Sequence, residues 1–84
     1  MAVEGRRNRY IAFRIAGGKT DRSGMIGAIR RAFSRSEYEK IKPWLTVFEG
    51  GRGIVRINHD GKERALEILN SIEVGGGKVE TLTT

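Results

Sequence analysis

The sequence contains no cysteine, and His59 is the single histidine among its 84 residues. Without cysteine the chain can form no disulfide, and it offers no thiolate nucleophile or thiolate metal ligand. One histidine is too few for a histidine-based metal cluster within one chain, so we expect neither a metal ion nor a cofactor to be bound. No apolar run approaches the roughly 18 residues of a membrane span, and the first residues lack the pattern of a signal peptide. These absences predict a soluble, cytoplasmic protein without a membrane partner.

The charge of the chain is strongly positive and unevenly distributed. The formal net charge is +6, and 11 of the 16 cations are arginines. Residues 1–35 carry a balance of +7, whereas residues 36–84 carry a balance of −1. Such a surface can serve solubility alone, but the concentration of guanidinium groups in one half favours a polyanionic partner, most often nucleic acid.

The stretch Arg9-Tyr10-Ile11-Ala12-Phe13-Arg14-Ile15 has the alternation of a β-strand. Because side chains point alternately to the two faces of a strand, the three large apolar residues share one face and can found a core. The opposite face carries an aromatic ring and a cation. We expect that second face to stay uncovered.

The rest of the chain alternates between helical and strand patterns. Residues 1–8 are predicted to be a flexible basic arm, and residues 9–84 a single domain. The predicted elements after the first strand are a helix that begins at Thr20-Asp21 and extends through Arg35, a short turn of helix or loop at 34–42, strands at 44–48 and 54–57, a helix from 58–60 to Gly75–Gly77, and a strand at 78–83. The order β-α-β-β-α-β predicts an α+β fold, a two-layer RRM-like or ferredoxin-like sandwich. Its four-stranded antiparallel sheet would carry both helices on one face.

No constellation of residues predicts catalysis by the chain itself. His59 has no partners that resemble a catalytic triad, and Gly50-Gly51-Arg52-Gly53 lacks the spacing of a P-loop and suits a hairpin turn. Acylphosphatase-like hydrolases share this order of elements, but they need an arginine-bearing phosphate loop after the first strand. Gly17-Gly18-Lys19 is a poor substitute for that loop, so we expect no catalytic residues.

The pattern is more typical of RNA binding through phosphates and shape than of base readout. In an RRM, aromatic residues on the first and third strands stack on bases. Here Arg52-Gly53-Ile54 keeps the start of the third-strand signature and lacks its aromatic residue, which leaves Tyr10 as the ring expected on strand one. Exposed arginines would then contact phosphates. The candidate RNA-binding residues are Arg6, Arg7, Arg9, Arg14, Arg30, Arg31, Arg35 and Arg56.

Three segments resemble one known family. Residues 9–15, then Lys42-Pro43-Trp44-Leu45-Thr46-Val47-Phe48, then Gly53-Ile54-Val55-Arg56, are similar to the archaeal ribonuclease P protein component 2, the archaeal relative of the eukaryotic Pop-five subunit. The resemblance covers roughly residues 6–83. It implies an RRM-like sandwich without the base-stacking motifs.

The resemblance also implies a function and partners. Members of this family are non-catalytic, RNA-binding subunits of a ribonucleoprotein that removes 5′ leaders from precursor tRNA, in which the RNA supplies the catalytic site with Mg²⁺. Their expected partners are the ribonuclease P RNA and the ribonuclease P protein component 3. The alternative is a ferredoxin-like module for protein interaction or homodimerisation, with incidental basic charge.

Overall fold

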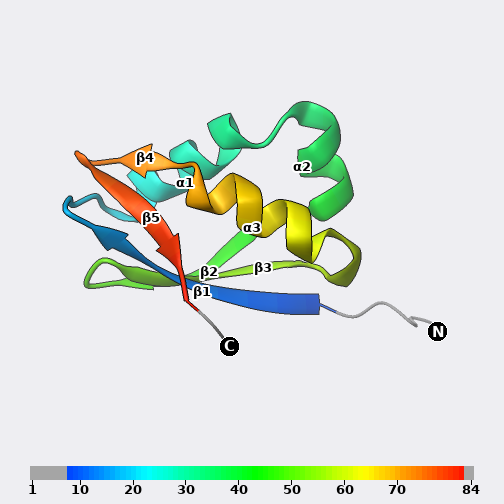
Figure 1. The fold of residues 1–84 in the computed structure, drawn as a ribbon, viewed down its shortest axis with the longest axis horizontal. Coiled ribbons are helices and arrows are strands. Elements are labelled where there is room, and N and C mark those ends of the chain that lie inside the picture. The colour runs from blue at the N-terminus through cyan, green and yellow to red at the C-terminus, as the bar shows by residue number, and fades with distance from the viewer. Residues whose placement is uncertain (1–7, 83–84) are drawn as a thin grey trace.

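The computed structural model describes residues 8–82, which form one sheet and three α-helices (Figure 1). The predicted arm, residues 1–8, lies outside this range except for Asn8, which begins the first strand. In chain order the elements are β1 (Asn8–Ala16), α1 (Arg22–Ala32), α2 (Arg35–Ile41), β2 (Trp44–Glu49), β3 (Arg52–Asn58), the 3₁₀ turn η1 (His59–Gly61), α3 (Lys62–Asn70), β4 (Glu73–Val74) and β5 (Gly77–Thr81).

The sheet has five strands in the order β2-β3-β1-β5-β4, and every neighbouring pair is antiparallel. The prediction of a mixed α+β fold with an antiparallel sheet is confirmed, but the prediction of four strands is wrong. The additional strand arises because Gly75 and Gly76 both have positive φ angles, 61° and 83°. Two such residues form a tight hairpin turn between β4 and β5, so they do not end the preceding helix, which stops at Asn70.

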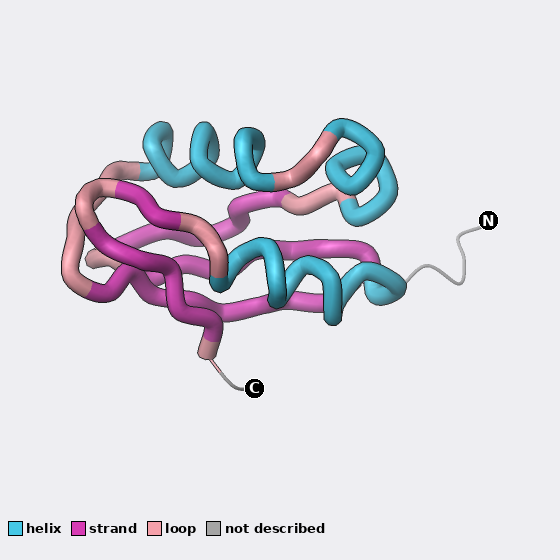
Figure 2. Tube along the Cα trace, turned by 45° about the horizontal axis from the view of Figure 1, so that its top comes forward, coloured by secondary structure: helices cyan, strands magenta, loops and turns pink. Residues whose placement is uncertain are grey.

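The three helices lie on one side of the sheet, and β5 and β4 curl up toward them (Figures 1 and 2). The predicted faces of β1 are confirmed, since Ile11 and Phe13 are buried while Tyr10 and Arg14 are exposed. The core joins these strand residues to the apolar stripes of the helices. Its members include Met25, Ile29 and Phe33 from α1 and its C-terminal cap, and Ala65, Ile68, Leu69 and Ile72 from α3 and the residues just after it.

The first predicted helix ends at Ala32 and does not extend through Arg35, and the short turn of helix predicted at 34–42 is present as α2. Asp21 caps α1 as predicted, accepting a 2.8 Å hydrogen bond from the Gly24 N–H. The backbone leaves the helical conformation at Phe33, and Ser34 then begins α2 with a capping box. Arg35 therefore belongs to α2 and does not extend the surface of α1. None of the helices described in residues 8–82 has the length and apolar character needed to cross a membrane.

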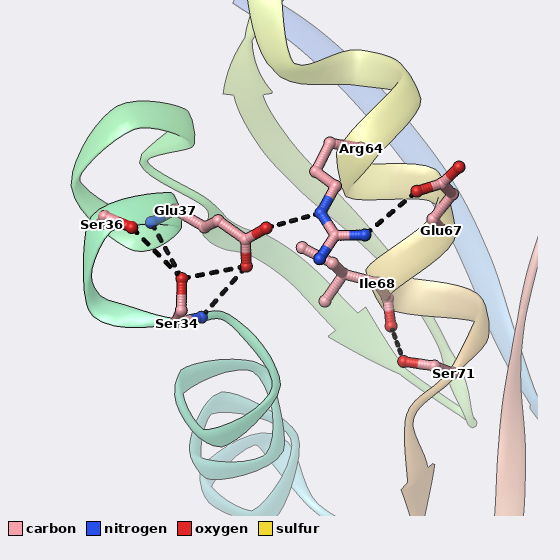
Figure 3. A network of polar contacts seen from close by, with 7 residues as sticks. All are labelled: Ser34, Ser36, Glu37, Arg64, Glu67, Ile68 and Ser71. Carbon is pink, nitrogen blue, oxygen red and sulfur yellow. Dashed lines mark hydrogen bonds and ion pairs between the residues drawn. The ribbon is translucent and has the colours of Figure 1, made fainter.

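Polar contacts fasten α2 to α3 (Figure 3). The Glu37 carboxylate accepts hydrogen bonds from the Ser34 N–H and from Nε of Arg64, which lies on α3. Arg64 also donates to Glu67 at 3.1 Å. The hydrogen bond from Arg64, with that from the Ser34 backbone, lowers the pKa of Glu37. These contacts set the position of α2 and of the segment that leads from it into β2.

Candidate nucleic-acid interface

The face of the sheet opposite the helices carries three rows of side chains from adjacent strands. Residues that pair across antiparallel strands point to the same face. We call the first the aromatic row: Tyr10 of β1 pairs with Arg56 of β3, and Arg56 pairs with Trp44 of β2. It places a guanidinium between two rings. Tyr10 is 55% exposed and Trp44 is 58% exposed, so neither ring is covered by the protein itself.

The second and third rows differ in chemistry. The second is apolar and consists of Ala12, Ile54 and Val47. The third, which we call the charged row, consists of Glu80, Arg14, Arg52 and Glu49. Within it, Arg14 forms a 3.0 Å salt bridge with Glu80. The two carboxylates at the ends of the row and the two guanidinium groups between them therefore largely offset one another at this end of the sheet, whereas Arg56 in the aromatic row has no carboxylate paired across the strands.

A groove of about 260 Å³ lies between α1 and the edge strand β2. One stripe of α1, at helical spacing, forms one wall with Arg22, Ile26, Ile29 and Arg30. The other wall comes from α2, the start of β2 and the residue before it, and consists of Tyr38, Pro43, Trp44 and Leu45.

The groove combines an apolar floor with two cations. Nη2 of Arg22 donates a 2.7 Å hydrogen bond to the carbonyl oxygen of Leu45, which holds α1 against the β2 edge. This bond uses one of the five N–H donors of the guanidinium. Ile26 is 38% exposed at the groove, although it is a large apolar side chain. No aspartate or glutamate lines the groove, so its electrostatic character is positive.

The structure places the predicted RNA-binding arginines on two surfaces. Arg14 and Arg56 lie on the open face of the sheet, on β1 and β3, whereas Arg9 pairs with the buried Ile57 and so lies at the start of β1 on the face that carries the helices. Arg30 and Arg31 lie in the last turn of α1, and Arg35 begins α2. Arg6 and Arg7 lie outside the described residues. The predicted arginines thus form one cationic group on the helical side and another on the open face of the sheet.

Each of the described arginines is exposed, but two of the candidates have acidic partners. Arg14 is paired with Glu80, as noted above. Arg35 lies 3.8 Å from Glu39, although its side chain remains 94% exposed. A second hollow, of about 320 Å³, joins Arg30 to Arg35 across the break between α1 and α2. Arg30 therefore takes part in both hollows.

Sequence reasoning missed Trp44 and Arg22. The pattern predicts that Trp44 lies on a strand but does not predict its face, and the predicted RNA-binding residues do not include Arg22. A signal for Arg22 was present, since it precedes Ile26 and Arg30 by four and eight residues and so shares their side of the helix. Among residues 8–82, no group of three or more His, Cys, Asp or Glu side chains is placed to hold a metal ion.

No protein-family model matches the chain, and no curated protein is similar to it at a significant level.

Proposed function

We propose that the chain is a non-catalytic, RNA-binding subunit of ribonuclease P that assists the RNA-catalysed removal of the 5′ leader from precursor tRNA. The observation that carries the proposal is the exposure of every arginine in residues 8–82, combined with the chain's net charge of +6. Guanidinium groups bind phosphates through paired N–H donors, and a surface rich in them attracts a polyanion.

The resembling segments support the same proposal. They form β1, β2 and β3, which lie side by side in the sheet, so the similarity covers one connected part of the fold. We further propose that the fold is RRM-like or ferredoxin-like. On that view, α2 and β4 are additions to the β-α-β-β-α-β order, and the remaining strands keep the order β2-β3-β1-β5.

The proposal assigns the partners as follows. The ribonuclease P RNA contacts the exposed arginines, and the ribonuclease P protein component 3 binds elsewhere on the cytoplasmic protein. The chain binds no cofactor of its own, and Mg²⁺ belongs to the RNA. The arginines thus neutralise phosphates where the RNA chain approaches itself, which lowers the Mg²⁺ requirement of the folded RNA.

Reconstitution tests this function. The chain is added, with its protein partner, to a cognate catalytic RNA, and cleavage of precursor tRNA is measured at limiting Mg²⁺. We expect cleavage to rise when the chain is present and to fall back when it is omitted. Equal cleavage with and without the chain, over a range of Mg²⁺ concentrations, would contradict the proposal.

A second candidate function rests on the uncovered sheet face. Tyr10, Trp44 and Val47 are the most exposed large hydrophobic side chains of the described part of the chain, and all three lie on that face. Exposed apolar surface of this kind also suits a protein-interaction or homodimerisation module. Concentration-dependent self-association in sedimentation experiments, together with no measurable RNA binding, would favour this second function.

A further inference from the structure

Trp44 belongs to both features described above. It ends the aromatic row on the open sheet face, and it also lines the groove between α1 and β2. The two features therefore form one continuous surface that passes over the β2 edge. Along this surface the side chains are Tyr10, Arg56, Trp44, Arg22 and Arg30.

Rings and guanidinium groups alternate along this surface from Tyr10 through Arg56 to Trp44, and the guanidinium groups of Arg22 and Arg30 follow in the groove. Tyr10 and Trp44 are separated by the two strand spacings of the sheet, about 9.5 Å between backbones. Arg56 occupies the strand between them. Proteins that bind single-stranded nucleic acid combine aromatic side chains, on which bases stack, with cations that follow the phosphates. The aromatic row has both components, two rings and one cation, at directly paired positions of three adjacent strands.

We propose that the aromatic row and the adjoining groove bind unpaired nucleotides of an RNA. Bases stack on Trp44 and Tyr10, while Arg56, Arg22 and Arg30 contact the phosphates. This inference rests on the proposed RNA-binding function. It adds the class of ligand, unpaired nucleotides, and the surface on which they bind. A duplex hides its bases within the stack, so it can contact the cations of this surface but not the faces of the rings.

Charge favours RNA over a protein as the occupant. Arg56 lies at the centre of the row, and Arg22 and Arg30 lie in the groove, which no carboxylate lines. A protein on this surface would need acidic groups matched to three separate guanidiniums. In a single-stranded nucleic acid the anionic groups repeat along the chain beside each base, which fits the alternation of cations and rings.

Tryptophan fluorescence tests the proposal directly, because Trp44 is the only tryptophan in the sequence. We expect a single-stranded oligouridylate to quench the emission of Trp44, since a stacked base contacts the indole. A blunt RNA duplex and heparin, which offer negative charge without accessible bases, should bind with little quenching. Binding itself is measured in parallel by anisotropy of labelled RNA.

Variants separate stacking from charge. Trp44→Leu should weaken binding of the single strand by roughly 5- to 150-fold, the range that corresponds to loss of one stacked base. Trp44→Phe keeps a ring and should lose less. Val47→Ala removes exposed apolar surface from the same strand and face without removing a ring, and it should bind as the parent does. Because both side chains are exposed, circular dichroism should show all three variants folded.

Two results would overturn the inference. If the oligouridylate binds by anisotropy while Trp44 emission is unchanged, and Trp44→Leu binds equally well, stacking at this surface is wrong and the RNA-binding function still stands. If neither single-stranded nor folded RNA binds at all, the proposed function fails together with the inference.

Discussion

The arginines at the end of α1 and the start of α2 offer the sharpest test of the electrostatic part of the proposal. We consider the triple variant Arg30→Gln, Arg31→Gln and Arg35→Gln. Each phosphate contact that is lost reduces the slope of log affinity against log salt by about 0.7–0.9. Arg35 already lies 3.8 Å from Glu39 and should contribute less than the others. We therefore expect the slope to become smaller by about 2.

The slope converts into a measurable difference in affinity. Over a fourfold rise in salt, the parent protein should lose about 16-fold more affinity than the variant does. The assay is filter binding of a cognate catalytic RNA at a series of KCl concentrations. Since all three side chains are exposed, each substitution should change the free energy of unfolding by no more than about 0.5 kcal/mol.

A matched control removes the same net charge from other surfaces. Lys19, Lys62 and Lys78 lie respectively in the loop after β1, at the start of α3 and on β5, and each is changed to Gln. We expect this control to keep most of the parent slope. If the arginine variant and the lysine control have the same slope, the binding depends on total charge, and the assignment of phosphate contacts to Arg30, Arg31 and Arg35 is refuted.

Three further predictions concern stability. Phe13 is fully buried, so Phe13→Ala should lower the free energy of unfolding by about 3–5 kcal/mol in urea titrations; a loss under 1 kcal/mol would contradict its central place in the core. Gly53→Ala would put a Cβ 2.6 Å from Cζ of Phe13 and 2.7 Å from the Val47 carbonyl oxygen, and it should cost about 1–3 kcal/mol. Gly27→Ala, which meets only the mobile tip of Arg31 at 3.3 Å, is the matched helical control and should stabilise by about 0.5–1 kcal/mol. Because Arg64 lowers the pKa of Glu37, the ionised carboxylate stabilises the fold above its ordinary pKa, and this contribution is lost as pH falls through the lowered value. The stability difference between the parent and Glu37→Gln should therefore shrink on acidification, and a difference constant with pH would contradict the role of this ion pair.

Alternation along β1 was enough to predict its two faces, because the strand is regular and lies in the middle of the sheet. The same rule fails for β2. Strict alternation would put Trp44 and Phe48 on one face, but the register shifts between Leu45 and Val47. This bulge reverses the alternation, so Phe48 turns inward and stacks on Phe13 at 6.3 Å between ring centroids, while Trp44 stays outward. Threonine at position 46 is not a residue type that indicates a bulge. The outward position of Trp44, the second ring of the aromatic row, therefore could not be predicted from the sequence.

The three glycines after α3 posed a different difficulty. A glycine run after an apolar helical stripe is typical of a helix end, but it is equally compatible with a hairpin turn. The choice depends on the tertiary structure around the turn. A Cβ at Gly75 would collide with the backbone of Lys19, and one at Gly18 would collide with the backbone nitrogen of Gly77, so the loop after β1 packs directly against the turn. Such a contact between distant segments is invisible to local patterns.

Tertiary structure also explains why the arginines of the chain do not form a single basic patch. β1 is central, so its outward side chains point away from the helices, whereas the cations of α1 lie on the helical side. Of the two sheet edges, β4 is the one that curls toward the helices (Figure 1) and β2 is the one that borders the groove. A ligand that contacts both sets of arginines along the groove must therefore pass over Trp44. It follows that removing the ring should uncouple the two surfaces: in a Trp44→Leu background, loss of Arg56 should no longer affect a ligand held at Arg30. A double-mutant cycle that shows the same effect of Arg56→Gln with and without Trp44 would refute this path.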